Sequence, residues 1–379
     1  MIAVTLVALL AMAETPSELN NRAVSLYREA RYGEAEKGYR AALDGWRETP
    51  GQERDRAITL NNLGVLYRST ARYGEAQAAL EEAVRQLRAI EREKGRGVAL
   101  ALANLADLQL LAGNAGQAEA MAREALEIYR ARGVKGPAPA TAMQVLATAE
   151  IERRRYPAAR ELLMQALAEV EGTPTSSREV AGRIRGTLAT LEIGTQDYAS
   201  AQANAVQALE ILRAVRGERH PDTASAMSNL AQVLRFEGRY AEAEPLYRKA
   251  IGVWEAALGR DHPDTGKGVL NLASFCHERG REAAAERLYI RARDTFSRSL
   301  GPGHPLTLTA ASGLADVYRA ERRLTEAVRL SREILTQMEL TLSEGDPKLE
   351  AAQMFDERVT AEAGQRWKKR PAVFGTGSR

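Results

Sequence analysis

Apolar residues recur along the chain with the spacing of amphipathic helices. One representative stripe follows the i, i+3, i+4, i+7 pattern of a helix with one buried face and consists of Met227, Leu230, Ala231 and Leu234. A polar turn at residues 237–240 separates it from a second stripe, made of Ala243, Tyr247, Ala250 and Trp254. Val and Ile seldom alternate with polar residues, so the pattern predicts no β-strand. We therefore expect an all-α fold built from pairs of helices.

This two-helix pattern returns eight times. Similar segments mark the turn inside each pair, for example ARYGEAE (30–36), ARYGEAQ (71–77), GRYAEAE (238–244) and GREAAAE (280–286), and they recur at a nearly constant interval. The units are predicted to start near residues 17, 56, 98, 139, 180, 222, 264 and 306, and together to fill residues 14–343. One such hairpin cannot bury its own apolar face, so we expect the hairpins to stack into a solenoid without a second domain.

Small residues stand at fixed offsets in these units. Ala231, Ala243 and Ala250 have counterparts in other units, namely Ala273, Ala285 and Ala292, and Gly64, Ala76 and Ala83. A larger side chain there would push neighbouring helices beyond the usual interaxial distance of about 8–10 Å. The eighth unit departs most, with Ile334 in place of an alanine. The spacing thus predicts closely packed helices rather than loosely joined ones.

This arrangement of small residues resembles the tetratricopeptide repeat. The unit here is longer than usual, at about 42 residues, and reads NLA…GRYAEAEPLYRKAI…LG…HPDT, which is similar to the repeats of kinesin light chains and their bacterial relatives. The resemblance covers nearly the whole chain. It implies a right-handed α-solenoid of about eight hairpins, whose first helices line a concave surface where asparagines contact peptide ligands.

Three of the four histidines belong to one recurring motif, HPDT or HPLT. It begins at His220, His262 and His304, and a glycine stands three residues before each histidine. Glycine accepts the left-handed backbone that ends a helix, and proline suits the first position of the next one. The histidine then becomes the N-cap. The motif therefore predicts a helix boundary, and no metal site is assigned, because equivalent positions in stacked repeats lie on the order of 10 Å apart.

The predicted first helices carry a second, polar stripe that faces away from the core. An asparagine recurs at one position of this stripe, at Asn21, Asn62, Asn104, Asn229 and Asn271, with Gln232 nearby in the sixth unit. Asparagine is a poor residue inside a helix, so its return needs a reason. Two interpretations stand equally open: a hydrogen bond to the neighbouring hairpin, or an amide ladder that pairs with the backbone of a bound peptide.

Arginines follow the same stripe at Arg68, Arg235 and Arg319, with His277 at the equivalent place in the seventh unit. They are candidates for attracting an acidic partner, although solvated surface charges explain each of them as well. Together with the asparagines and Gln232 they form the predicted peptide-binding set.

Charge does not indicate a nucleic-acid partner. The chain has 53 basic and 50 acidic residues, but five of the basic ones lie in the last fourteen residues, at Arg366, Lys368, Lys369, Arg370 and Arg379. The remaining 48 basic residues are matched by the acidic ones, and no concentrated basic face is predicted. We expect residues 367–379 to be a disordered basic tail and 344–366 to be a helix that caps the array.

The first thirteen residues form an apolar run that ends in Ala11-Met12-Ala13, as in a short signal peptide. No lysine or arginine precedes the run, so export and a cytoplasmic location both stay open, with export as the expectation. No other segment predicts a membrane span. The single cysteine, Cys276, is expected to be a buried small hydrophobe.

No motif for catalysis, cofactors or metals is present: the sequence contains no P-loop, HExxH, CxxC or GxSxG. We therefore expect a non-enzymatic scaffold that binds a peptide segment or partner protein in the concave groove. The alternative is a sensor or adaptor subunit of a complex whose chemistry lies on another chain.

Overall fold

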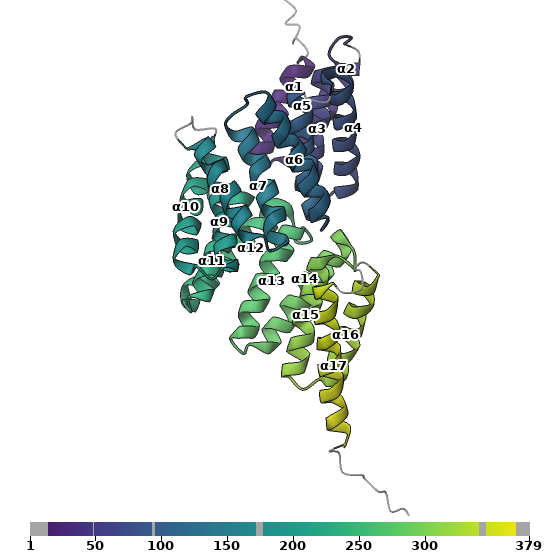
Figure 1. Cartoon of the computed structure of the whole chain (residues 1–379), viewed down its shortest axis with the longest axis vertical. Helices are drawn as coiled ribbons and strands as arrows, with labels where there is room; N and C mark the ends of the chain where they lie inside the picture. The colour runs from purple at the N-terminus through teal and green to yellow at the C-terminus, as the bar shows by residue number, and fades with distance from the viewer. Residues whose placement is uncertain (1–13, 48, 93–94, 172–176, 341–345, 369–379) are drawn as a thin grey trace, which may run out of the picture. The chain divides into compact units, whose positions relative to one another are not determined.

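The described part of the protein is all-α, with helices joined by short turns and linkers (Figure 1). A computed structural model describes residues 14–47, 49–92, 95–171, 177–340 and 346–368, and this part contains 17 helices and no strand. The all-α prediction is confirmed. The expected signal peptide at 1–13 and residues 369–379 of the tail expected at 367–379 lie outside the described residues, whereas residues 367 and 368 belong to the last helix.

Sixteen of the helices form eight consecutive hairpins. In chain order the hairpins are α1 (Pro16–Arg28) with α2 (Tyr32–Arg47), α3 (Glu53–Ser69) with α4 (Tyr73–Glu91), α5 (Arg96–Leu111) with α6 (Ala115–Ala131), α7 (Pro137–Glu152) with α8 (Tyr156–Val170), α9 (Arg178–Gly194) with α10 (Tyr198–Arg216), α11 (Pro221–Phe236) with α12 (Tyr240–Leu258), α13 (Pro263–Glu278) with α14 (Glu282–Leu300), and α15 (Pro305–Ala320) with α16 (Leu324–Glu339). The last helix is α17 (Pro347–Lys368). We call the odd-numbered members first helices and the even-numbered members second helices.

The chain divides into two compact units. The N-terminal unit holds Met1–Leu110 and Ala115–Arg153, and the C-terminal unit holds Leu111–Asn114 and Arg154–Arg379. Each unit has its own apolar core, in which alanines from several helices are packed between larger side chains. The N-terminal core is centred on Leu66, Leu80 and Tyr129, and the C-terminal core on Tyr247, Phe275 and Phe296.

The small residues at fixed offsets make this packing possible. Ala231, Ala243 and Ala250 are fully buried, as are their alanine counterparts in the other units named above. At Gly64, an added Cβ would lie 2.7 Å from Cγ of Leu80, and real Cβ atoms do not come so close to a carbon atom. The side-chain volume at these positions therefore sets how closely two helices approach.

Hairpins turn on a residue with a positive φ angle. Gly238 has a φ of 76° and Gly280 one of 67°, whereas Ala71 and Arg322 adopt the same conformation with a side chain, at 59° and 61°. Two backbone hydrogen bonds close the turn. In the sixth hairpin they run from the N–H of Gly238 to the oxygen of Arg235, 3.0 Å, and from the N–H of Arg239 to the oxygen of Leu234, 2.8 Å. This pair of bonds satisfies carbonyls that a helix end leaves without an intrahelical partner.

The HPDT motif is a helix boundary, as its spacing predicts. His220, His262 and His304 are the N-caps of α11, α13 and α15, and their Nδ1 atoms accept the backbone N–H two residues later at 3.1, 3.1 and 3.2 Å. A proline follows each histidine at the first helical position. The N-cap prediction is confirmed.

The glycine of this linker adopts a different conformation from the expected one. Gly217, Gly259 and Gly301 have φ angles of 82°, 94° and 100°, but their ψ angles of 169°, 166° and 161° lie far from the left-handed helical value. This region is open essentially to glycine alone. The carbonyl of each glycine accepts a 2.8 Å hydrogen bond from the threonine hydroxyl six residues later, at Thr223, Thr265 and Thr307. The motif therefore closes a loop between helices, which the sequence pattern did not reveal.

Ion pairs join consecutive second helices within each unit. Arg88 on α4 pairs with Glu124 on α6, and Glu255 on α12 pairs with Arg291 on α14, at equivalent places but with the charges exchanged. Between α10 and α12, Glu218 from the linker pairs with both Arg213 and Lys249. We call these contacts cross-helix ion pairs.

The last helix, α17, packs against α16. Leu349 and Val359 on α17 are buried, and Phe355 lies against the C-terminal core. Ser331 of α16 donates a 2.5 Å hydrogen bond to Oδ1 of Asp356. Of the described helices, none combines the length and the apolar character that crossing a membrane requires.

Candidate functional site

The first helices of the C-terminal unit form a continuous polar surface. Consecutive first helices α9, α11, α13 and α15 contact one another directly, whereas consecutive second helices of this unit show no comparable contact in its described residues. Because the first helices lie closer together, their side is the inner side of the unit. We call this side the first-helix surface and define it by Thr190, Ser225, Asn229, Gln232, Arg235, Asn271, Ser274, Asp316 and Arg319.

The recurrent asparagines bind the repeat that precedes them. In the N-terminal unit, Asn62 donates to Oδ1 of Asn20 at 3.2 Å, and Asn104 donates to Oδ1 of Asn61 at 2.9 Å. In the C-terminal unit, Asn229 donates to the backbone oxygen of Gly186 and Asn271 to Oγ of Ser228, each at 3.2 Å. Every acceptor lies on the preceding first helix, one position before the equivalent of the asparagine itself.

These bonds establish the inter-repeat interpretation for four of the five asparagines. Asn21, on the first helix of the array, is exposed, and its amide has no such bond within the described residues. The bond uses one of the hydrogen-bonding sites of each amide, which has two N–H groups and an oxygen with two lone pairs. In Asn229 and Asn271, the second N–H and the oxygen make no further hydrogen bond to described residues, so these half-buried amides keep capacity for a ligand.

The predicted arginines are already paired with acidic side chains. Arg68 pairs with Asp107 on the next first helix, and Nε of Arg235 lies 3.6 Å from Glu278. Arg319 lies 3.5 Å from Asp316 and 3.7 Å from Glu362 of α17. At the equivalent place, His277 Nδ1 and Glu282 Oε2 are 2.6 Å apart. The first-helix surface is therefore close to charge balance, and these arginines are compensated before an acidic partner arrives.

Two features of the C-terminal unit were missed by sequence reasoning. One is an aromatic stack at the end of α11: the Tyr198 and Phe236 rings lie 5.6 Å apart and nearly parallel, and the Arg235 guanidinium lies 4.5 Å from the centroid of Phe236. Phe236 is 39% exposed, in contrast to the buried Phe275 and Phe296. The sequence did contain an indication of this stack, because the aromatic residue Phe236 directly follows Arg235, the last polar position of the first helix.

The other feature is a buried carboxylate. Glu192 of α9 is only 2% exposed, although the same position is apolar in the next two repeats, at Leu234 and Cys276. Asn204 Nδ2 donates to both of its oxygens at 3.2 and 3.0 Å, and Arg160 lies 3.6 Å away. Burial raises the pKa of Glu192 above the usual value, against the lowering effect of the Asn204 bonds.

The remaining candidate chemistry is inert. Cys276 is buried, as predicted, and burial raises the pKa of its thiol, which disfavours the reactive thiolate. The described residues contain no group of three side chains suited to holding a metal ion. The Nδ1 atoms of the three linker histidines each accept a backbone N–H, so they serve the helix boundaries.

Known proteins give a consistent picture of the fold. The family description "Tetratricopeptide repeat" matches residues 15–89, 97–168, 181–256, 226–267 and 268–339. No curated protein matches the chain. Among solved structures, the chain is similar to the apo form of the quorum sensor NprR from B. thuringiensis, with 13% identity, a TM-score of 0.59, and 85% of this chain and 87% of that chain covered.

Two further solved structures illustrate the range of this similarity. A Rap protein complexed with Competence and Sporulation Factor shares 14% identity at a TM-score of 0.50, over 94% of this chain and 99% of that one. A putative kinesin light chain from Podosopora anserina, with nearly identical repeats, shares 23% identity at a TM-score of 0.43, over 49% and 88%. At these identities the likeness concerns the fold.

Proposed function

Because the chain belongs to the tetratricopeptide repeat family, we propose that it is an interaction scaffold that binds a peptide segment or a partner protein on the first-helix surface. The family fold supports a role in protein interaction. Two proteins of similar fold bear names that point the same way, since one is a quorum sensor and the other is complexed with Competence and Sporulation Factor. The proposal assigns no chemical step to the chain, and the action is binding alone.

One observation carries the proposal: the inner surface of the C-terminal unit presents hydrogen-bonding groups, and its charges are close to balance. Hydroxyls at Thr190 and Ser225 are exposed, Gln232 is half-buried, and the amides of Asn229 and Asn271 keep unused donors and acceptors. An extended backbone needs both donors and acceptors along its length, so such a surface suits a peptide better than a charged ligand.

The proposal is tested by blocking the surface with exposed substitutions. Thr190→Arg combined with Ser225→Arg places two long side chains on α9 and α11, at exposed positions outside the core, and leaves Asn229 and Asn271 themselves unchanged. The matched control is Ala199→Arg combined with Ala241→Arg, since both alanines are exposed on second helices α10 and α12. Each tagged chain is used to isolate partners from its native cells.

We expect the partner that co-purifies with the wild-type chain to be lost with the first-helix variant and kept with the control. If the partner stays with the first-helix variant and disappears with the control, the binding surface lies on the second helices and the proposal is wrong. The same preparation, assayed with its partner, separates a scaffold from a sensor subunit of an enzyme complex.

A further inference from the structure

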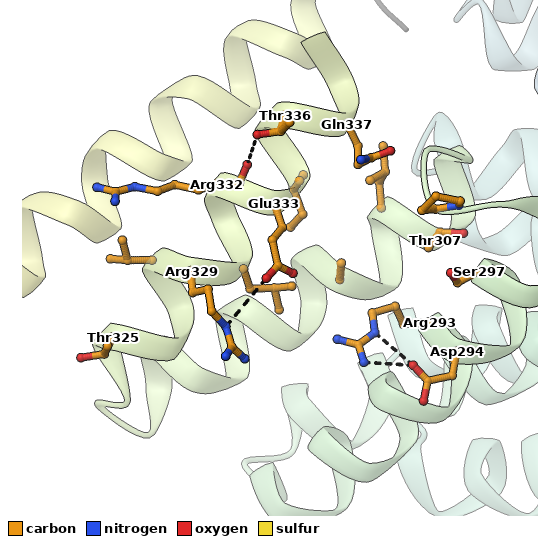
Figure 2. A pocket seen from close by; sticks show the side chains of 16 residues that line it. Arg293, Asp294, Ser297, Thr307, Thr325, Arg329, Arg332, Glu333, Thr336 and Gln337 are labelled. Atoms are coloured by element: carbon orange, nitrogen blue, oxygen red, sulfur yellow. Dashed lines mark hydrogen bonds and ion pairs between the residues drawn. The ribbon is translucent and has the colours of Figure 1, made fainter. Parts of the chain in front are cut away.

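The outer side of the C-terminal unit has an open groove between α14 and α16 (Figure 2). Its volume is about 960 Å³. The floor is apolar, with Leu308, Ala311, Leu330 and Ile334, and the walls carry Arg293, Asp294 and Ser297 on α14 and Arg329 and Glu333 on α16. We call it the α14–α16 groove. It lies between second helices and is distinct from the first-helix surface.

Within the described residues, the cross-helix ion pair is absent at this groove, as it also is between α2 and α4, where Arg47 pairs with Asp44 of its own helix. Relative to the turn residue of their own hairpins, Arg88, Glu255 and Ser297 hold one equivalent position, and Glu124, Arg291 and Glu333 hold another. Arg88 pairs with Glu124, and Glu255 with Arg291. In the last interface Ser297 is too short and uncharged to pair with Glu333 across the groove.

Glu333 and Asp294 both keep carboxylate oxygens for a ligand. Glu333 has only a loose contact within its own helix, with Arg329 Nε at 3.8 Å. On the opposite wall, Arg293 directs two hydrogen bonds to a single oxygen of Asp294, Oδ1, at 3.2 and 2.9 Å. Asp294 lies one helical turn before Ser297, so the two carboxylates flank the place of the missing cation.

We propose that the α14–α16 groove binds a segment of a partner protein that presents an arginine or lysine between apolar side chains. The cation occupies the space beside Ser297, between Asp294 and Glu333, and the apolar side chains cover the floor. A charge-assisted hydrogen bond over an apolar floor combines orientation with burial. An acidic segment fits less well, because it would bring further carboxylates next to Asp294 and Glu333, and Arg293 and Arg329 already contact these two acids.

The test uses short random peptides displayed on phage as the probe. Peptides are selected on the full chain and then measured, as labelled synthetic peptides, on Ser297→Arg by fluorescence anisotropy. This substitution supplies the missing cation from the chain itself and fills the groove. Ala283→Arg is the matched control, because Ala283 is exposed on the same helix outside the groove.

We expect a class of peptides that bind about tenfold more weakly to Ser297→Arg, the size of one charge-assisted hydrogen bond, and equally well to Ala283→Arg. Peptides of this class carry arginine or lysine beside apolar residues. They also weaken about tenfold on Glu333→Gln combined with Asp294→Asn, a variant that keeps the volume of both side chains. Their binding to the Thr190→Arg, Ser225→Arg chain is unchanged, which separates this groove from the first-helix surface.

The proposal is overturned if no selected peptide distinguishes Ser297→Arg from Ala283→Arg, or if the peptides that do so carry aspartate or glutamate. A melting curve of Ser297→Arg accompanies the binding data, and we expect it to lie at or above that of the wild type, because the introduced arginine can pair with Glu333. If Ser297→Arg is unstable, the peptides are instead compared on the variant that combines Glu333→Gln with Asp294→Asn. Unchanged binding to that variant would likewise overturn the proposal.

Discussion

Single residues in this protein are chosen for what they do at a fixed place in the repeat. Gly313 illustrates this, because it replaces the recurrent asparagine in the eighth hairpin, and an added Cβ would lie 2.3 Å from the ring of Tyr289. The hydroxyl of Tyr289 donates instead to Ser274 on the first-helix surface, at 3.1 Å. The eighth hairpin therefore lacks the asparagine amide at this position, and the Tyr289 hydroxyl supplies a hydrogen-bonding group in its place.

Glu192 departs from the pattern with a different effect, on the pH dependence of stability. Its pKa in the folded protein is raised above 4.5 by burial, so the folded chain binds this proton more tightly than the unfolded chain. The resulting stabilisation is complete below pH 4.5 and is lost as the pH rises through the folded pKa. The loss amounts to about 1.4 kcal/mol for each unit by which the pKa is raised.

We expect Glu192→Gln to escape this loss. The free energy of unfolding of the variant, relative to the wild type, should rise between pH 4 and pH 7, as measured by urea denaturation across that range. Glu210→Gln changes an exposed carboxylate on the adjacent helix α10 and serves as the control. A difference between Glu192→Gln and the wild type that stays constant over this range would contradict the role of burial.

At the scale of helices, contacts between repeats are directional. The asparagine bonds join first helices, and the cross-helix ion pairs join second helices, so a hairpin is held to its neighbour on both sides. A third contact lies at the turns, where Arg323 pairs with Glu286 of the preceding hairpin and Arg281 with Glu244. Polar contacts therefore add to the apolar packing that holds each hairpin against its neighbour.

We expect Asn271→Ala to lower the free energy of unfolding by about 1 kcal/mol, because it removes the bond to the buried Ser228 and leaves that hydroxyl without this partner. Asn21→Ala, which removes an exposed side chain at the start of the array, should change stability by less than about 0.5 kcal/mol. Urea denaturation of both variants checks this. Equal effects would mean that the bond from Asn271 to Ser228 contributes nothing to stability.

The hairpins and their boundaries could be predicted from the sequence because they depend on local patterns. Apolar periodicity defined the helices, and His220 and Pro221 defined the start of one of them. The acceptor of Asn229 could not be predicted, because it depends on the rotation of one repeat against the next, which no local pattern encodes. The same holds for Ser297, whose short side chain matters only because Glu333 lies across the groove.

At the scale of the whole chain, the hairpins follow one another in sequence, and within each compact unit neighbouring helices pack together. The last hairpin has no successor in the described residues, and α17 takes that place against α16, with Leu349 and Val359 buried. Predicted residues 344–366 thus correspond in position to a helix at Pro347–Lys368.

We expect removal of residues 346–379 to destabilise the C-terminal unit by several kcal/mol, because each buried large apolar side chain contributes about 1.5–3 kcal/mol. The measurement is the melting temperature together with binding of a dye that reports exposed apolar surface. Removal of residues 369–379 alone is the control and should leave both unchanged. A truncated chain without α17 that melts like the wild type would show that α17 is dispensable for the array.

The direction of the asparagine bonds has a consequence for how the protein is made. In each of the four pairs the donor amide belongs to the later repeat and the acceptor to the earlier one. When a hairpin leaves the ribosome, the hairpin that holds the acceptor has already been synthesised. The asparagine bond can therefore form before the rest of the chain is made. The array can therefore fold one hairpin at a time during translation. The acceptor on the earlier hairpin sets the register of each hairpin that is added.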